Sequence, residues 1–195
     1  MITLDGEAVR STVDTFRELL DRVPDAEAAV PVMEGTVFFV VEHVAGPLAH
    51  YAHDLAAGPT EVWATELRRL PDADLPKMSA SVGAWAEVLA RTLDAASRSE
   101  RGWHPFGRPD PEGYAAMACV EVLVHGNDIA GALGLSWAPS IFIAVAVLDR
   151  LFPDVERTEN PMADLVWATG RADPTGVRPR RESWRYATAP LQERA

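Results

Sequence analysis

The sequence predicts an all-α fold: an antiparallel bundle of four main helices, with an extra helix and a short irregular C-terminal tail. Three observations carry this prediction. Over most of the chain, apolar residues recur at the three- and four-residue spacing of helices. Stretches rich in proline and glycine, which interrupt regular structure, separate these segments. With 195 residues, of which 48% are hydrophobic and 24% charged, the chain is typical of one soluble globular domain.

The first half of the chain is predicted to form three helices. Their expected ranges are 6–22, 36–57 and 79–96. Asp5 is placed to cap the first helix, because a carboxylate can accept hydrogen bonds from free backbone N–H groups. Gly46-Pro47 interrupts the second helix. Since proline cannot donate a hydrogen bond to the carbonyl of His43, we expect a kink or a one-turn break there.

A loop and two further helices are predicted in the second half. The loop at 101–111 holds too much glycine and proline to be regular. The next helix, 111–133, has proline at its start and Gly134 just past its end, as helix termini prefer. An apolar helix over 139–152 is stopped by Pro153.

The charge distribution divides the chain into a helical bundle, residues 1–170, and a basic tail, residues 171–195. The tail carries six arginines and three acidic residues, a net charge of +3, whereas the rest of the chain has a net charge of −14. The tail is expected to pack on the acidic bundle with Trp184 and Tyr186 as anchors. The alternative is a basic arm that binds a polyanion.

Composition also excludes several classes of protein. The net charge of −11 argues against nucleic acid or an anionic membrane as partner, since either needs a basic surface. A single cysteine, Cys119, excludes an internal disulfide and a cysteine-based zinc cluster. The sequence shows neither a signal-peptide pattern nor about 18 uninterrupted apolar residues, so we expect a cytoplasmic protein. It leaves a homodimer open.

One constellation of residues on the 111–133 helix carries chemistry. Glu121 and His125 are four residues apart, so they share one face of a helix whose other residues are largely apolar. A carboxylate and an imidazole in an apolar setting need a partner. A divalent metal would supply one, with His43 of the second apolar helix as third ligand and open positions for water or substrate. Asp128 would orient the imidazole of His125.

Glu121 and His125 have an alternative interpretation, and several other residues are candidates for the site or for the core. Glu121 and His125 can form an ordinary ion pair on a helix surface. His50, seven residues after His43, projects near the same helix face and is a candidate ligand, acid/base or substrate contact, and His104 in the long loop is a candidate substrate contact. Cys119 points away from Glu121 and is expected to be a buried small residue. Three tryptophans are expected in the core or at its boundary: Trp63, Trp85 and Trp137.

Two segments resemble a known family. Residues 36–45 (TVFFVVEHVA) are similar to the first conserved helix of DinB-like proteins. Residues 110–134 (DPEGYAAMACVEVLVHGNDIAGALG) resemble the second signature of one branch, the mycothiol-dependent maleylpyruvate isomerase N-terminal-domain family of actinobacteria. Residues 165–171 and Trp184 resemble its closing segment, so the similarity spans most of the chain. The 17 arginines against one lysine fit a GC-rich genome of that kind.

The resemblance implies a DinB-type bundle in which His43, Glu121 and His125 hold a divalent metal, usually zinc. It further implies mycothiol as thiol cosubstrate, activated as thiolate for S-transfer to a small electrophile or for thiol-assisted isomerisation.

This chain departs from the family at Glu34-Gly35, at Gly46-Pro47 and at Asn127, and it is too short for the isomerase's second domain. These departures leave the substrate open. Two alternatives remain: metal-dependent chemistry without a thiol, and a DinB-like binding module without catalysis.

Overall fold

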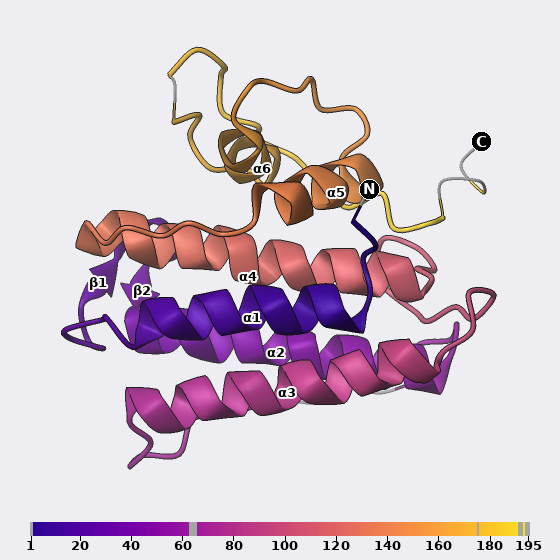
Figure 1. Cartoon of the computed structure of the whole chain (residues 1–195), viewed down its shortest axis with the longest axis horizontal. Coiled ribbons are helices and arrows are strands. Elements are labelled where there is room, and N and C mark those ends of the chain that lie inside the picture. The colour runs from indigo at the N-terminus through magenta and orange to yellow at the C-terminus, as the bar shows by residue number, and fades with distance from the viewer. Residues whose placement is uncertain (1, 63–65, 175, 191–192, 194–195) are drawn as a thin grey trace.

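The structure of the protein, a computed structural model, describes residues 2–62, 66–174, 176–190 and 193. Helices dominate this part of the chain, so the prediction of an all-α fold is confirmed (Figure 1). The helices are α1 (Gly6–Leu20), α2 (Val37–Ala57), α3 (Leu75–Ala95), α4 (Pro111–Leu133), α5 (Ile141–Leu151) and α6 (Pro161–Ala168). The two-residue strands β1 (Ala29–Val30) and β2 (Gly35–Thr36) pair antiparallel around the short 3-10 helix η1 (Pro31–Met33).

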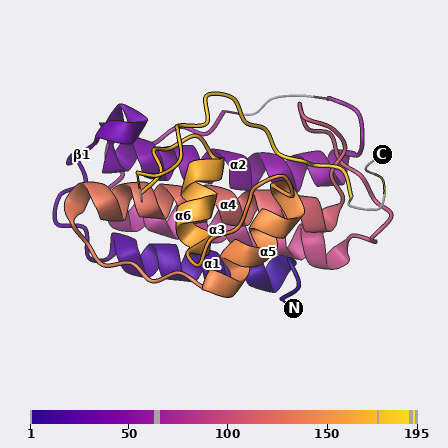
Figure 2. The ribbon, with the colours of Figure 1, turned by 90° about the horizontal axis from the view of Figure 1, so that it is seen from above.

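The four long helices pack along one another, and α4 lies at the centre of the molecule. Both α1 and α2 contact α3 and α4, while α5 and α6 cover the side of α4 that faces away from the other long helices (Figures 1 and 2). Most residues of α4 are therefore buried, as expected of a helix that is apolar on nearly every face. By length and composition α4 could also cross a membrane, but 72% of its apolar window is buried inside the molecule.

The helix boundaries follow from local signals. The side chain of Asp5 accepts hydrogen bonds from the backbone N–H groups of Glu7 and Ala8 and caps α1, as predicted. The bounds of α4 agree with the prediction, with Gly134 in the left-handed conformation directly after it. The helix expected at 79–96 begins earlier, at Leu75, because Asp74 caps it and the proline that follows is tolerated in a first turn.

The structure differs from the sequence-based expectations in two local features. Of the kink or one-turn break expected at Gly46-Pro47, the break is absent, because α2 runs as one helix through Pro47. Buried residues on both sides of the proline, Val44 and Leu48 among them, hold the helix together at the cost of one backbone hydrogen bond. The small hairpin and α6 were not predicted. The hairpin strands are too short to show a period. The start of α6 is marked by Pro161 and by the side chain of Asn160, which accepts from the backbone N–H of Ala163, but its eight residues are too few to show a helical period.

The described part of the C-terminal tail lies against the helices. Tyr186 and Thr188 are buried, and the ring of Tyr186 packs on those of Phe152 and Trp184 with centroids 5.8 Å and 5.3 Å away. The backbone N–H of Ala187 donates to the carbonyl of Leu151 at 3.0 Å. Arginines of the tail pair with aspartates of the preceding chain: Arg171 with Asp128, Arg178 with Asp164, and Arg181 with Asp154.

Candidate metal centre

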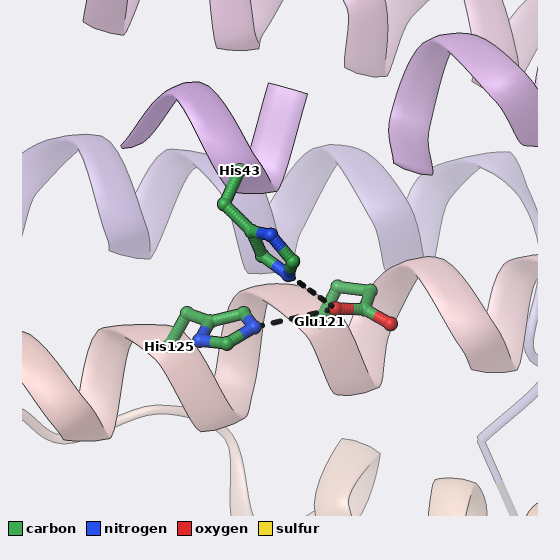
Figure 3. A group of neighbouring side chains, drawn as sticks. All are labelled: His43, Glu121 and His125. Atoms are coloured by element: carbon green, nitrogen blue, oxygen red, sulfur yellow. Dashed lines mark ion pairs between the residues drawn. The ribbon is translucent and has the colours of Figure 1, made fainter. Parts of the chain in front are cut away.

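The structure brings His43, Glu121 and His125 together between α2 and α4 (Figure 3). His43 comes from the first half of α2, while Glu121 and His125 stand one turn apart on α4. One ligand atom from each residue lies within 4.8 Å of the other two. Two helices that pack on each other thus supply two imidazoles and one carboxylate to the same point.

The distances in this cluster fit a divalent metal with nitrogen and oxygen ligands. Glu121 Oε2 lies 3.4 Å from His125 Nε2 and 3.9 Å from His43 Nε2. Bonds of about 2.0–2.1 Å to a tetrahedral zinc ion place neighbouring ligand atoms roughly 3.3 Å apart, so small side-chain adjustments complete the geometry. The rings of His43 and His125 meet edge to face with centroids 4.7 Å apart, so they do not stack over each other.

Asp128 orients His125. Its Oδ2 lies 3.1 Å from His125 Nδ1, and because a carboxylate only accepts hydrogen bonds, Nδ1 is the nitrogen that carries the proton. The other ring nitrogen, Nε2, then presents its lone pair to the cluster once the ring is neutral. Imidazoles that bind metals commonly make such a contact with a carboxylate. Asp128 is in turn held by Arg171, whose Nη2 donates to Oδ2 at 2.8 Å.

Two tyrosines hold Glu121 from the side opposite to the histidines. The hydroxyl of Tyr186 donates to Glu121 Oε1 at 2.7 Å, and the hydroxyl of Tyr51 approaches the same oxygen at 3.5 Å. The other oxygen, Oε2, faces the two imidazoles. The two carboxylate oxygens therefore have separate partners: phenols for one and the candidate ligands for the other.

Glu121 and His43 have the protonation states that metal binding needs, whereas His125 has to lose a proton when a metal binds. Burial lowers the pKa of His43, and the neighbouring His125 lowers it further. Burial would raise the pKa of Glu121, but contacts with His125 and Tyr186 outweigh it and lower this pKa. Burial would lower the pKa of His125, but its hydrogen bonds to Asp128 and Glu121 prevail and raise it. At neutral pH, Glu121 is thus ionised and His43 neutral, the states in which these groups bind metals.

The cluster opens into the largest of the cavities described, with a volume of about 740 Å³. Its wall comes mainly from the chain after α6 and from α4, and it includes three arginines: Arg171, Arg180 and Arg181. The side chain of His43 is 42% exposed, whereas that of His125 is 6% exposed, so solvent reaches the cluster from the side of His43. A cavity of this size falls within the range of small-molecule sites.

Two other candidate residues lie outside this cavity. His50 lines a separate pocket of about 290 Å³ together with Trp103 and His104. It shares a helix face with His43, but seven residues advance a helix by about 10 Å, which carries His50 past the cluster. Within the described ranges, the group with suitable metal-binding geometry consists of His43, Glu121 and His125.

Cys119 is buried and faces α1, where the hydroxyl of Thr12 donates to its sulfur at 3.6 Å. Burial raises the pKa of its thiol to about 12. Trp85 and Trp137 are partly buried against the core, as expected. Trp63 lies outside the described residues.

The contacts that Tyr51, Arg171 and Tyr186 make around the cluster were not predicted from the sequence. Tyr186 was expected only as an anchor of the tail, and nothing in its sequence context indicates a bond to a glutamate 65 positions earlier. A weak signal existed, because a buried tyrosine or carboxylate needs a hydrogen-bond partner. That rule does not tell which residue the partner is.

Comparisons of this chain with protein-family models, with curated proteins and with solved structures found no match.

Proposed function

We propose that this chain is a divalent-metal-dependent enzyme of the DinB-like kind, with a four-helix bundle as its framework. In this proposal a low-molecular-weight thiol, mycothiol, attacks a small electrophile, either for S-transfer or for thiol-assisted isomerisation. The observation that carries the proposal is the convergence of His43, Glu121 and His125 at the floor of an open cavity. The resemblance of residues 36–45 and 110–134 to that family, taken from the sequence, supplies the thiol.

The residues present fit zinc best. Two imidazoles and a carboxylate are typical of catalytic zinc sites, which keep a further position for water or substrate. When bound there, such an ion would stabilise the deprotonated form of a thiol or a water molecule at neutral pH. Asp128 holds the imidazole of His125 in place, and Tyr186 holds the carboxylate of Glu121, so neither ligand has to be ordered when substrate arrives.

The position of Cys119 supports an external thiol. It is the chain's only cysteine, it is buried against Thr12, and burial keeps its thiol protonated. Sulfur chemistry in the cavity therefore needs a cosubstrate.

In S-transfer, the thiol's S–H bond and the electrophile's bond to its leaving group break, a C–S bond forms, and the proton leaves with the leaving group. In isomerisation, sulfur adds to an activated double bond, the new single bond rotates, and sulfur departs unchanged.

The proposed partners are small molecules. We expect neither nucleic acid nor a membrane as partner, because the chain has a net charge of −11. In addition, three arginines of the tail form ion pairs with aspartates of this chain: Arg171, Arg178 and Arg181. A cytoplasmic location and a homodimer are part of the same expectation.

Mass spectrometry of reaction mixtures tests the function. Purified protein is analysed for bound metal and then incubated with chloro-dinitrobenzene or maleylpyruvate, with and without mycothiol. We expect about one metal ion per chain and a product that forms only when mycothiol is present. Absence of bound metal from the purified wild-type protein would contradict the proposal. Product formation without mycothiol would favour metal-dependent chemistry that needs no thiol, and bound metal without turnover would favour a binding module.

Variants locate the activity. His43→Ala and His125→Ala are expected to lose bound metal and turnover together. His53→Ala is the matched control, because His53 lies on the same helix as His43 but pairs with Asp54 and does not line the cavity. Equal losses in all three variants would contradict the assignment.

A further inference from the structure

We propose that Tyr186 and Arg171, both beyond α6, are positioning residues of the metal centre, so that the C-terminal tail sets its affinity for metal. This inference rests on the metal-binding part of the proposed function and does not depend on the thiol. It assigns a role to the tail that the resemblance in sequence does not supply.

Tyr186 determines which oxygen of Glu121 is available. Its hydroxyl, held in the buried cluster of rings formed with Phe152 and Trp184, donates to Oε1 at 2.7 Å. A rotation of the carboxylate that offered Oε1 to the metal would break this hydrogen bond. Glu121 is thereby prepared to bind through Oε2 alone, on the side of the two imidazoles.

Arg171 plays the corresponding part for His125. The carboxylate of Asp128 is 2% exposed, and Arg171 contacts both of its oxygens, at 2.8 Å for Oδ2 and 3.4 Å for Oδ1. Oδ2 also accepts a hydrogen bond from the Nδ1–H group of His125. Without the guanidinium, Asp128 would be a buried carboxylate that has lost both hydrogen bonds from Arg171, a costly arrangement that favours movement of the side chain. The orientation of His125 therefore depends on a residue of the tail.

Both ligands that α4 provides are thus tied to the tail: Glu121 by Tyr186, and His125 by Arg171, which acts through Asp128 and also lies 3.4 Å from His125 Nδ1. The third ligand, His43, comes from α2 and lies at the open rim of the cavity. Binding and tail placement are then linked: if the docked tail strengthens metal binding by some factor, bound metal strengthens docking by the same factor. The tail acts on the centre by fixing side-chain positions, because neither Tyr186 nor Arg171 belongs to the ligand set.

A pair of tyrosine variants provides the test. Tyr186→Phe removes the hydroxyl that lies 2.7 Å from Glu121 Oε1, and Tyr114→Phe removes the hydroxyl of another buried tyrosine, which donates to the carbonyl of Trp103 at 2.6 Å and does not line the cavity. Both keep the aromatic ring, so the second variant is a matched control for the first. Zinc affinity is measured by competition with a chromophoric chelator, and cobalt(II), a spectroscopic substitute for zinc, reports the coordination geometry through its visible absorption spectrum.

We expect Tyr186→Phe to weaken zinc binding about 10-fold, at the lower end of what loss of such an outer contact costs. Its cobalt spectrum should change, whereas Tyr114→Phe should stay within about threefold of wild type with an unchanged spectrum. Arg171→Met is expected to weaken zinc binding by a similar factor, and it serves as the test variant if Tyr186→Phe fails to fold.

The proposal is overturned if Tyr186→Phe, or Arg171→Met in its place, binds zinc within about threefold of wild type with an unaltered cobalt spectrum. It is also overturned if Tyr114→Phe loses as much affinity as Tyr186→Phe, because the loss would then follow from removing any buried tyrosine hydroxyl. A wild-type chain that binds no zinc would overturn both this inference and the proposed function. Normal zinc binding with insensitive variants would overturn the inference alone.

Discussion

Replacing Arg150 by methionine is expected to destabilise the protein and to release its C-terminal tail. The guanidinium of Arg150 is 2% exposed, lies between α4 and the tail, and pairs with Asp110 at 2.7 Å. It also donates to three consecutive carbonyls of the tail: those of Ala187, Thr188 and Ala189. Methionine keeps most of the apolar stem and removes the charge, so the variant isolates the clamp from the packing of the side chain.

The expected loss is about 3 kcal/mol of the free energy of unfolding. Removing one partner of a buried ion pair costs about 3–5 kcal/mol. The lower end applies here, because Asp110 keeps its hydrogen bond from the backbone N–H of Gly113 and because freed tail carbonyls can reach water. Summing each lost hydrogen bond separately would overstate the effect, since the tail can relax as a unit.

Urea denaturation followed by circular dichroism measures this loss. Arg157→Met is the control, because Arg157 pairs with Asp149 at the surface, where the two side chains are 31% and 62% exposed. Exposed pairs of this kind contribute at most about 1 kcal/mol. A loss below about 1 kcal/mol in Arg150→Met, or equal losses in the two variants, would refute the view that Arg150 fastens the tail.

Three further predictions concern the metal, the cysteine and pH. Zinc at 100 times its Kd should stabilise the wild type by about 2.7 kcal/mol, roughly 5–10 °C in a thermal melt, and should leave His125→Ala unchanged; equal shifts would speak against the site. Cys119, whose pKa burial raises to about 12, should resist iodoacetamide at pH 8 until the chain is unfolded, as mass spectrometry can show; rapid labelling of the folded protein would contradict this. Hydrogen bonds from Arg10 lower the pKa of Glu87 to about 2, below its unfolded value, so this pair stabilises the fold at neutral pH and the contribution is lost as pH falls from about 4.5 toward 2. Arg10→Gln should therefore flatten the pH dependence of the urea midpoint in that window, and an unchanged profile would argue against it.

Much of the fold could be predicted because its signals are local. The bounds of α4 follow from Pro111 and Gly134, and the start of α1 follows from Asp5. The one-turn break that Pro47 suggested is absent because buried neighbours on both sides hold α2 together. Tertiary packing outweighs the local preference of proline here. The short α6 was missed because eight residues are too few to show a helical period.

The candidate site likewise contains residues that local sequence signals predict and residues that they do not. The spacing of Glu121 and His125 on one helix is a local property, so periodicity alone could place them on one face. The approach of His43 depends on how α2 packs on α4, and the sequence suggested it only through a second apolar helix that carries histidine. The contacts of Arg171 and Tyr186 depend on the path of an irregular tail, and irregular chain has no period that could indicate where its side chains go.

The arginines of the tail explain why it lies over the candidate metal centre rather than elsewhere. Asp128 and Asp164 have side chains that are 2% and 0% exposed, and each is paired with an arginine of the tail. Buried pairs of this kind add little net stability, because desolvation offsets most of the attraction. They penalise other placements, since a shifted tail would leave two buried carboxylates without their cations. The opposite charges of tail and bundle therefore select a register, and that register is the one that carries Tyr186 to Glu121.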